Sequence, residues 1–106
     1  MIFVSMVIEA DQEKSTGLAE AMSTMMEKTR AEAGCITYTY ARDIAAPNRF
    51  HLTEIWQSEA LMDQHIDASH SAEFVSVLKV SARIVSVKAF SGDAKKFRIR
   101  APAPRI

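Results

Sequence analysis

Cysteine, glycine and proline are all scarce in this chain of 106 residues, which has one cysteine, three glycines and three prolines. The lone Cys35 excludes an internal disulfide framework and any metal site built from several cysteines. No apolar run approaches the ~20 residues that a membrane-spanning helix needs, and no basic-then-apolar leader precedes Ile2. The composition therefore predicts a cytoplasmic protein without membrane contact, and the length suits one domain.

Acidic residues are absent after Asp93, whereas five basic residues follow that position. Up to residue 94 the chain carries eight basic and thirteen acidic side chains, so its zero net charge combines an acidic body with a basic tail. A basic tail can bind nucleic acid or a membrane surface. Here, however, Phe97, Ile99 and Ile106 are interleaved with the charges, and apolar residues favour docking on protein. We therefore expect neither nucleic acid nor membrane as a partner.

Four stretches rich in β-branched or alternating apolar residues predict strands, over residues 2–9, 35–43, 49–56 and 84–90. Apolar residues at helical spacing predict one helix between the first two strands and a second helical region, broken at residues 67–69, before the last strand. This order is that of the ferredoxin-like βαββαβ fold, an α+β arrangement with an antiparallel sheet. We expect this domain over residues 1–92, and a tail over 93–106 that packs on its own protomer or on a partner.

Local signals predict where these elements end and which way their side chains face. Asp11 is expected to cap the first helix, and Gly34 to close it in a left-handed conformation. In the second strand, Ile36, Tyr38 and Tyr40 alternate with smaller residues and are expected to share one face.

The first strand is apolar on both of its faces, which has a consequence for assembly. In a ferredoxin-like fold the helices cover only one face of the sheet. The second apolar face needs a partner, and the simplest partner is another copy that meets it sheet to sheet. We therefore expect a homodimer.

Candidate functional residues are densest in the third predicted strand. Alternation places Glu54 and Trp56 on one face, together with Phe50 and Leu52. A carboxylate beside an indole on a half-buried strand requires a partner or water, because burying an unpaired charge is costly. Glu54 is therefore a candidate for acid–base chemistry, although a pairing with an arginine or a backbone amide would make its role structural.

His65 and His70 are five residues apart, about 140° around a continuous helix. This is not the i, i+4 spacing of zinc-binding helices. A break near residues 67–69 would let both rings converge on one cleft, but each could also be a packed or capping histidine. His51 is expected on the face opposite Trp56. The chain has no phosphate-binding glycine loop and no nucleotide fingerprint, so we expect no cofactor and no metal.

Several segments of this chain resemble the antibiotic biosynthesis monooxygenase (ABM) family. They are Gly34–Tyr38, Phe50–Ser58, His65 and His70–Phe74. The most specific part is Glu54 and Trp56 two residues apart, with both histidines downstream. The resemblance covers residues 1–90 and implies a dimeric α+β barrel. Lys95–Phe97, followed by Pro102, is similar to the end of a subgroup that degrades autoinducer-2.

The resemblance implies a pocket between the helices and the sheet, and a cofactor-independent monooxygenase that oxidises an electron-rich phenol or quinol with O₂. In this interpretation His65 deprotonates the substrate, Glu54 or His70 orients the base or a hydroxyl, and Trp56 stacks on the ring. Four further apolar residues are expected to contact the substrate: Phe50, Leu52, Met22 and Phe74.

Two other functions are compatible with the same scaffold. One is isomerisation of a small hydroxyketone of the autoinducer-2 type, which needs a proton shuttle but no O₂. The other is a dimeric module that binds small molecules or serves in stress without catalysis, in which the histidines are structural. Oxygen consumption separates the first function from the second, and ligand binding without turnover would identify the third.

Overall fold

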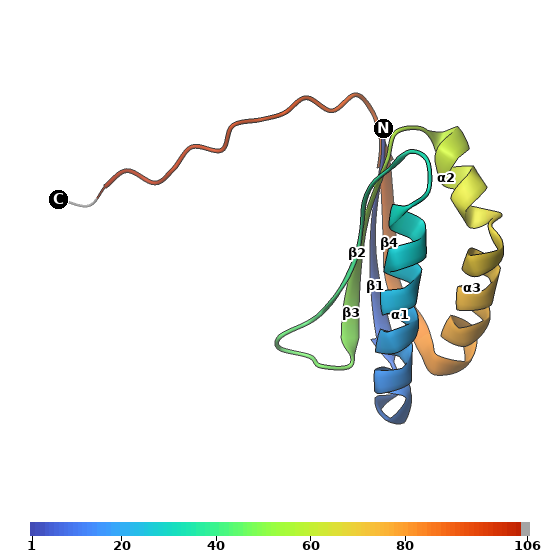
Figure 1. Cartoon of the computed structure of the whole chain (residues 1–106). Helices are drawn as coiled ribbons and strands as arrows, with labels where there is room; N and C mark the ends of the chain where they lie inside the picture. The colour runs from blue at the N-terminus through green and yellow to red at the C-terminus, as the bar shows by residue number, and fades with distance from the viewer. Residues whose placement is uncertain (105–106) are drawn as a thin grey trace.

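The four strands of this chain form one antiparallel sheet with the order β2-β3-β1-β4, and the helices lie on one of its faces (Figure 1). The computed structural model describes residues 1–104. The elements are β1 (Ile2–Ala10), the short 3-10 helix η1 (Gln12–Lys14), α1 (Ser15–Arg30), β2 (Cys35–Arg42), β3 (Arg49–Trp56), α2 (Glu59–Ile66), α3 (Ser69–Ser81) and β4 (Ala82–Ser91). This arrangement confirms the predicted α+β ferredoxin-like fold. Within the described residues, no helix is long and apolar enough to cross a membrane.

The core lies between the helices and the inner face of the sheet. On β3, Phe50, Leu52, Glu54 and Trp56 are all buried, as the alternation of the sequence predicts. Leu18 of α1 packs against this face and is buried as well, together with Met22, Met25 and Thr29 at the same helical spacing.

The first helix begins and ends differently from the prediction. Asp11 makes no side-chain capping bond within the described residues, because η1 intervenes and α1 begins four residues later at Ser15. Gly34 does have a positive φ of 82°, but it lies just before β2 rather than at the helix end, where Ala31 stays right-handed. The left-handed glycine therefore turns the chain into the sheet.

Ile36 also departs from its predicted position. The pairing of β2 with β3 shifts register between Cys35 and Thr37, so Ile36 falls in the irregular step and is 47% exposed. Tyr38 and Tyr40 follow the shift and are buried on the inner face, as predicted. A local bulge thus separates Ile36 from the two tyrosines.

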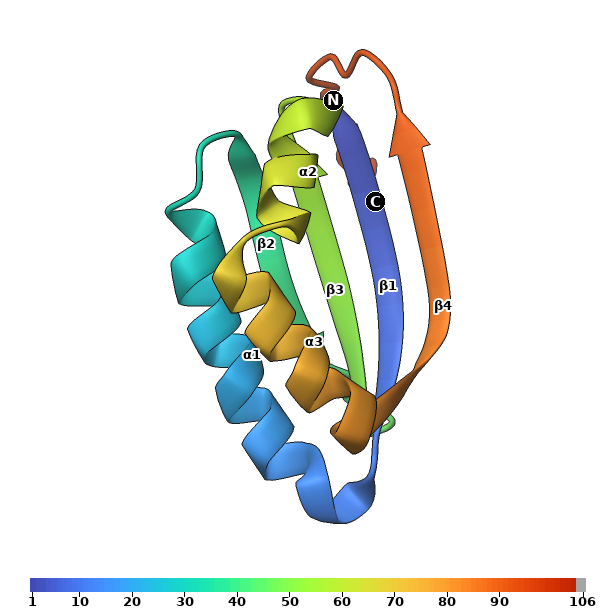
Figure 2. The same ribbon diagram turned by 90° about the vertical axis from the view of Figure 1, so that its right-hand side faces the viewer.

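The helices cover the sheet unevenly. Figure 2 shows α1, α2 and α3 over the β2 and β3 side, while β4 lies beyond them. Consistent with this view, Ile84 and Val87 of β4 remain about half exposed even though they line the space in front of the sheet. The fold therefore leaves an open, apolar region beside α3.

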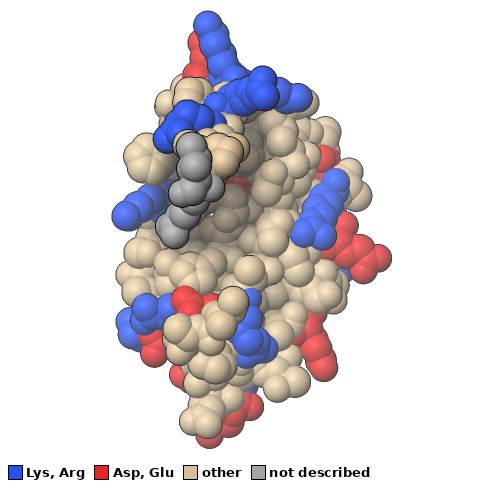
Figure 3. Space-filling model, turned by 90° about the vertical axis from the view of Figure 1, so that its left-hand side faces the viewer, with Lys and Arg blue, Asp and Glu red and all other residues tan. Residues whose placement is uncertain are grey.

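The outer face of the sheet carries an apolar row near the end at which β1 begins. Register places Ile55, Phe3 and Phe90 side by side across β3, β1 and β4, opposite in direction to the buried Glu54. Figure 3 shows this face with few charged side chains in its middle and Lys, Arg, Asp and Glu around its edge. No helix of the described chain covers this surface (Figure 1).

The tail after β4 has no regular secondary structure in its described part, residues 93–104, and every one of these residues is exposed. It runs away from the domain on the side opposite the helices (Figure 1). Phe97 and Ile99 are more than 80% exposed. The last two residues of the predicted tail, Arg105 and Ile106, lie outside the described residues.

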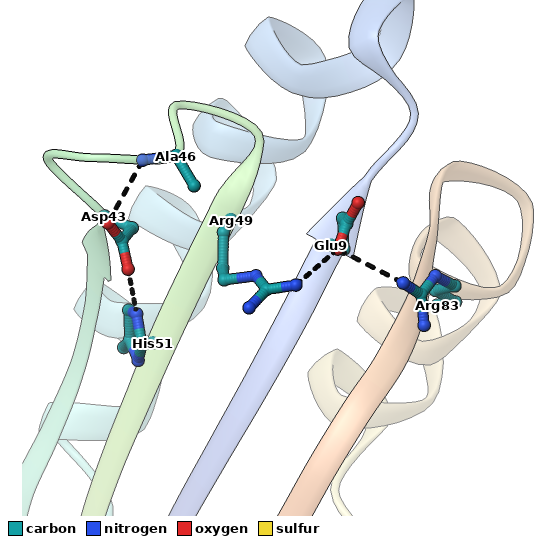
Figure 4. A network of polar contacts seen from close by, with 6 residues as sticks. All are labelled: Glu9, Asp43, Ala46, Arg49, His51 and Arg83. Atoms are coloured by element: carbon teal, nitrogen blue, oxygen red, sulfur yellow. Dashed lines mark hydrogen bonds and ion pairs between the residues drawn. The ribbon is translucent and has the colours of Figure 1, made fainter.

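Ion pairs tie the strands together at one end of the sheet (Figure 4). Glu9 of β1 binds Arg49 of β3 at 2.7 Å and Arg83 of β4 at 3.2 Å. The hydrogen bond from Arg49 and the charge of Arg83 lower the pKa of the Glu9 carboxyl. His51, predicted to face away from Trp56, is exposed and lies 2.8 Å from the Asp43 carboxylate. These contacts join β1, β3 and β4 at this end of the sheet, and β3 to the loop after β2.

Candidate active site

A cavity of about 680 Å³ lies between α2, α3 and the inner face of the sheet. Most of its lining is apolar, with side chains from β1, β3, α3 and β4. Its polar lining comes chiefly from Tyr38, Tyr40, Glu54, His65 and Ser71. Such a concave, largely apolar space with a few convergent polar groups is typical of a small-molecule site.

His65 stands in the last turn of α2 and is buried. The helix begins where Ser58 caps it, since the Ser58 hydroxyl accepts a hydrogen bond from the backbone N–H of Leu61. Leu61 and His65 are one turn apart and share a face of α2. The imidazole packs on the Trp56 indole with ring centroids 4.9 Å apart, and its edge meets Tyr38 at 5.4 Å. These rings fix the orientation of His65 against the cavity.

The Nδ1 atom of His65 is held by a carboxylate. Nδ1 lies 2.7 Å from Oε2 of Glu32, a residue of the loop between α1 and β2. The Ser71 hydroxyl donates to the backbone carbonyl of His65 and lies 3.5 Å from the same Nδ1. Nε2 of His65 makes no hydrogen bond to the described chain. A carboxylate that accepts from Nδ1–H leaves Nε2 as the basic nitrogen.

Glu32 was not among the residues that sequence analysis selected, and it is central to the site. Gly34 explains how it comes close to α2. A Cβ at Gly34 would lie 2.8 Å from Leu61 Cβ, so glycine alone lets α2 approach the loop this closely. The backbone of Gln57 also donates to the Gly34 carbonyl at 2.9 Å. The loop and the start of α2 are thus locked together, with Glu32 beside His65.

His70 approaches the same carboxylate from the first turn of α3. Its Nε2 lies 3.0 Å from Oε1 of Glu32. The break between α2 and α3 brings the two rings close, with centroids 6.0 Å apart, but they line different cavities. His70 does not line the large cavity. It lines a smaller one of about 190 Å³ between α1 and α3, so Glu32 stands between the two imidazoles.

Glu54 lines the cavity from β3, and one of its carboxylate oxygens accepts a hydrogen bond from Trp56. The Trp56 indole Nε1 donates to Oε1 of Glu54 at 2.9 Å. Burial raises the pKa of the Glu54 carboxyl, while the Trp56 hydrogen bond and the nearby His65 oppose the rise. This environment makes Glu54 a carboxyl that can change protonation more easily than a surface glutamate.

Two tyrosine hydroxyls complete the polar part of the cavity. Tyr38 donates to the hydroxyl of Tyr40 at 3.4 Å, and the rings meet edge to face. Burial raises the pKa of Tyr38 well above its usual range, and burial also raises the pKa of Tyr40 to about 12. Both hydroxyls therefore stay protonated at neutral pH. Because Tyr38 gives its proton to Tyr40, the Tyr40 hydroxyl is the one left to donate to a ligand.

The remaining residues selected from the sequence are divided between the cavity and the core. Leu52 and Phe74 line the cavity. Trp56, Phe50 and Met22 are buried in the core and lie outside the cavity lining, with Trp56 behind His65. Burial raises the pKa of the Cys35 thiol, which disfavours the reactive thiolate.

Together these groups suit proton transfer next to an apolar ligand. His65 lines the cavity and its Nε2 makes no hydrogen bond within the described chain. Glu32 can balance the charge that forms when this nitrogen gains a proton, and Glu54 and the tyrosines offer polar groups. A positioned base of this kind typically contributes about 10²–10⁴-fold to a reaction rate.

Two proteins of known sequence are similar to this chain over about 70% of its length. A Synechocystis protein, sll1783, is 31% identical over 74 residues, which cover 70% of this chain. The match covers 50% of sll1783, so the chain spans about half the length of that relative. YcnE of Bacillus subtilis, named as a candidate monooxygenase, is 28% identical over 76 residues, covering 72% of this chain and 80% of its own.

Solved structures share the fold. A candidate antibiotic biosynthesis monooxygenase from Deinococcus radiodurans superposes with a TM-score of 0.82 at 23% identity, covering 92% of this chain and 99% of its own. Rv0793 from Mycobacterium tuberculosis gives a TM-score of 0.80 at 18% identity, covering 89% and 96%. The sequence profile of the antibiotic biosynthesis monooxygenase family matches residues 1–77. The chain therefore belongs to the antibiotic biosynthesis monooxygenase family.

Proposed function

We propose that this protein is a monooxygenase that oxidises an electron-rich phenol or quinol with O₂, without a bound cofactor. The observation that carries the proposal is the 2.7 Å contact between Glu32 Oε2 and His65 Nδ1 beside a cavity of about 680 Å³. Membership of the family and the name of YcnE support the class of reaction.

The first step is removal of the phenolic proton by Nε2 of His65. The imidazolium that forms is stabilised by the Glu32 carboxylate. A phenolate gives up an electron far more readily than the neutral phenol, so deprotonation prepares the substrate for O₂. The protein's part is to hold this anion beside the apolar side chains that line the cavity.

The oxidation then proceeds on the substrate itself. The phenolate transfers one electron to O₂, and the resulting superoxide and phenoxyl radical combine to form a C–O bond and a peroxide. Loss of a ring proton and cleavage of the O–O bond give a quinone, with one oxygen atom retained. The second oxygen leaves as water, using the proton that His65 received. The overall reaction is a phenol plus O₂ giving a quinone plus water, which balances.

The remaining polar groups orient the substrate in this proposal. Tyr40 donates a hydrogen bond to a substrate oxygen and accepts one from Tyr38, and Glu54 accepts from a second hydroxyl through the oxygen that Trp56 leaves free. Trp56 supports the His65 ring from behind, in place of the direct ring stacking that the sequence suggested. Leu52 and Phe74 contact the apolar body.

Two copies of the chain form the active species in this proposal. The row of Ile55, Phe3 and Phe90 on the outer face has no cover within the described chain. A second sheet packed on this row would remove it from water. The tail leaves the domain on this same side, where Phe97 and Ile99 can reach the partner.

An oxygen electrode tests the reaction directly. The unaltered protein is mixed with a panel of mono- and polycyclic phenols and quinols, and O₂ uptake is compared with that of His65→Gln. We expect uptake that falls by about 10²–10⁴-fold in the variant. His51→Gln is the matched control, because His51 also pairs with a carboxylate but points to the opposite face of the sheet and does not line the cavity.

The same panel separates the alternatives. Turnover of a small hydroxyketone without O₂ uptake would replace the proposal with an isomerase. Ligand binding with no turnover in either assay would replace it with a binding module. His65→Gln with unchanged O₂ uptake would remove His65 from the mechanism.

A further inference from the structure

We propose that Glu32, His65 and His70 form a binding site for a divalent transition metal ion, with Zn²⁺ as its best-suited occupant. The site lies beside the large cavity and is distinct from the substrate position. Binding of the ion stands on the geometry of these three side chains alone. Only the effect of the ion on turnover rests on the proposed function.

Three different segments converge at this point. Glu32 comes from the loop after α1, His65 from the end of α2 and His70 from the start of α3. One ligand atom from each residue lies within 4.8 Å of the other two. The carboxylate faces both rings, with Oε2 at 2.7 Å from His65 Nδ1 and Oε1 at 3.0 Å from His70 Nε2. The three donors therefore already surround one point.

The contact between His70 and Glu32 differs from an ordinary hydrogen-bonded ion pair. Nε2 of His70 is buried and has no hydrogen-bond partner within the described chain, although the Glu32 oxygen is only 3.0 Å away. The direction of the contact does not suit a hydrogen bond. A buried nitrogen without a partner is costly, and an ion held between nitrogen and carboxylate would remove that cost.

The donor set indicates which ions fit. Two imidazoles and one carboxylate are the protein ligands of many zinc sites, which keep a further position for water. The same ligands suit other first-row divalent ions such as Co²⁺. Zinc–nitrogen bonds of about 2.0–2.1 Å require the donors to move apart slightly from their present contacts. Loop and helix ends, where all three residues lie, accommodate such a shift.

The ion and the proposed base reaction exclude one another. A metal on Nδ1 of His65 leaves the ring proton on Nε2, the nitrogen that faces the cavity in the proposed mechanism. Nε2 then donates a hydrogen bond and accepts no proton. Zinc is therefore expected to inhibit turnover, and a chelator to restore it, which is opposite to the behaviour of a metal-dependent enzyme.

The test measures binding without activity. The full chain is stripped with a chelator, and Zn²⁺ binding is followed by calorimetry, with Co²⁺ as a coloured probe. We expect one ion per chain and a visible Co²⁺ absorption band. His70→Gln should weaken binding at least about 10²-fold, because even outer-shell partners are worth 10–100-fold. His51→Gln is the control and should keep the stoichiometry and the band.

A second measurement uses the unaltered protein, in case the variant folds poorly. Histidine ring ¹⁵N resonances are recorded during a Zn²⁺ titration, and Nδ1 of His65 and Nε2 of His70 should shift with the same midpoint. The proposal fails if Zn²⁺ shifts neither ring, or if His70→Gln binds as tightly as the original chain. If the protein showed these shifts but took up no O₂ with any substrate, the proposed function would be wrong and the metal site would be supported.

Discussion

Glu32 and His65 are 33 positions apart in the sequence, yet Oε2 of the carboxylate lies 2.7 Å from Nδ1 of the imidazole. Glu32→Gln keeps an oxygen that accepts from Nδ1–H but removes the charge that stabilises the imidazolium. We expect kcat to fall by about 10²–10⁴-fold with little change in KM, since triad carboxylates act in this way. Steady-state oxygen uptake over a range of substrate concentrations measures both constants.

Glu27→Gln serves as the control for this variant. Glu27 is an exposed glutamate on α1 and does not line the cavity. Its replacement should leave kcat and KM unchanged. A rise in KM alone for Glu32→Gln would mean that the carboxylate binds substrate instead of supporting the base.

Gly34→Ala tests how the loop and α2 are joined. At φ 82° an alanine is strained, and its Cβ would overlap the Leu61 side chain. The left-handed conformation costs about 1–2 kcal/mol and overpacking about 1–3 kcal/mol. We expect the free energy of unfolding to fall by about 2–4 kcal/mol, measured by urea denaturation. Turnover should fall too, because α2 must move and carries His65 away from Glu32.

Gly17→Ala is the control for this substitution, because an added Cβ at Gly17 meets no other side chain. Gly17 stands in α1, and apart from its chain neighbours and the nearby backbone of its own helix, no heavy atom of the described chain lies within 4 Å of a Cβ there. Alanine is favoured over glycine in helices, so this variant should be as stable as the original or up to about 1 kcal/mol more stable. If Gly34→Ala behaved in the same way, the close approach of Leu61 would not be a constraint.

The inner face of β3 illustrates what could be predicted from the sequence. Period-two alternation placed Phe50, Leu52, Glu54 and Trp56 on one side, and all four are buried there. In a regular strand successive side chains point to opposite faces, so a short segment without a bulge shows which residues share a face. The helix break between His65 and His70 was also visible in a short segment, since Ser69 begins a new helix.

Other features depend on contacts that no local pattern records. Glu32 lies in a loop without periodicity, and its partners are supplied by two distant helices. Ile36 alternates correctly in sequence, but a register shift against β3 moves it to the surface. Trp56 was expected to meet a substrate, yet it packs behind His65 because α2 approaches so closely. In each case the deciding partner is far away along the chain.

Phe90→Lys tests the association of two copies. Phe90 is 66% exposed on β4 and lies beside Phe3 in the outer row. A lysine there would place an unpaired charge in the proposed sheet-to-sheet contact, which is costly. We expect multi-angle light scattering at micromolar concentration to report a dimer for the original chain. For the variant we expect a monomer, or aggregation.

Ile44→Lys is the control for this charge. Ile44 is fully exposed in the loop between β2 and β3, away from the outer row. This variant should keep the mass of the original chain. A monomeric mass for the original chain itself would contradict the proposed dimer.

Asp43→Asn tests the pair at the far end of the sheet (Figure 4). The hydrogen bond with His51, followed by those from the Ala45 and Ala46 backbone amides, lowers the pKa of Asp43 in the folded state. A depressed carboxyl pKa stabilises the fold above the unfolded pKa, and this contribution is lost as the pH falls through the folded value. Asp43→Asn should therefore be less stable than the original at neutral pH.

The difference between the two proteins should shrink as the solution becomes acidic. Urea denaturation at several pH values between about 3 and 7 measures this convergence. Asp63→Asn is the control for the substitution itself, because Asp63 is an exposed residue of α2. A constant difference across the range would mean that the charge of Asp43 does not contribute.

The open side of the cavity has a consequence for how this domain can be altered. The groups suited to proton transfer are carried by the loop after α1, by β2, by β3 and by α2, whereas α3 and β4 supply most of the remaining apolar wall. Ser71 and Lys79 are eight residues apart on α3, about 12 Å along its axis, so much of this wall lies well away from His65. Substitutions confined to Val75, Leu78 and Val87 should therefore change which substrates bind, without altering the residues suited to proton transfer.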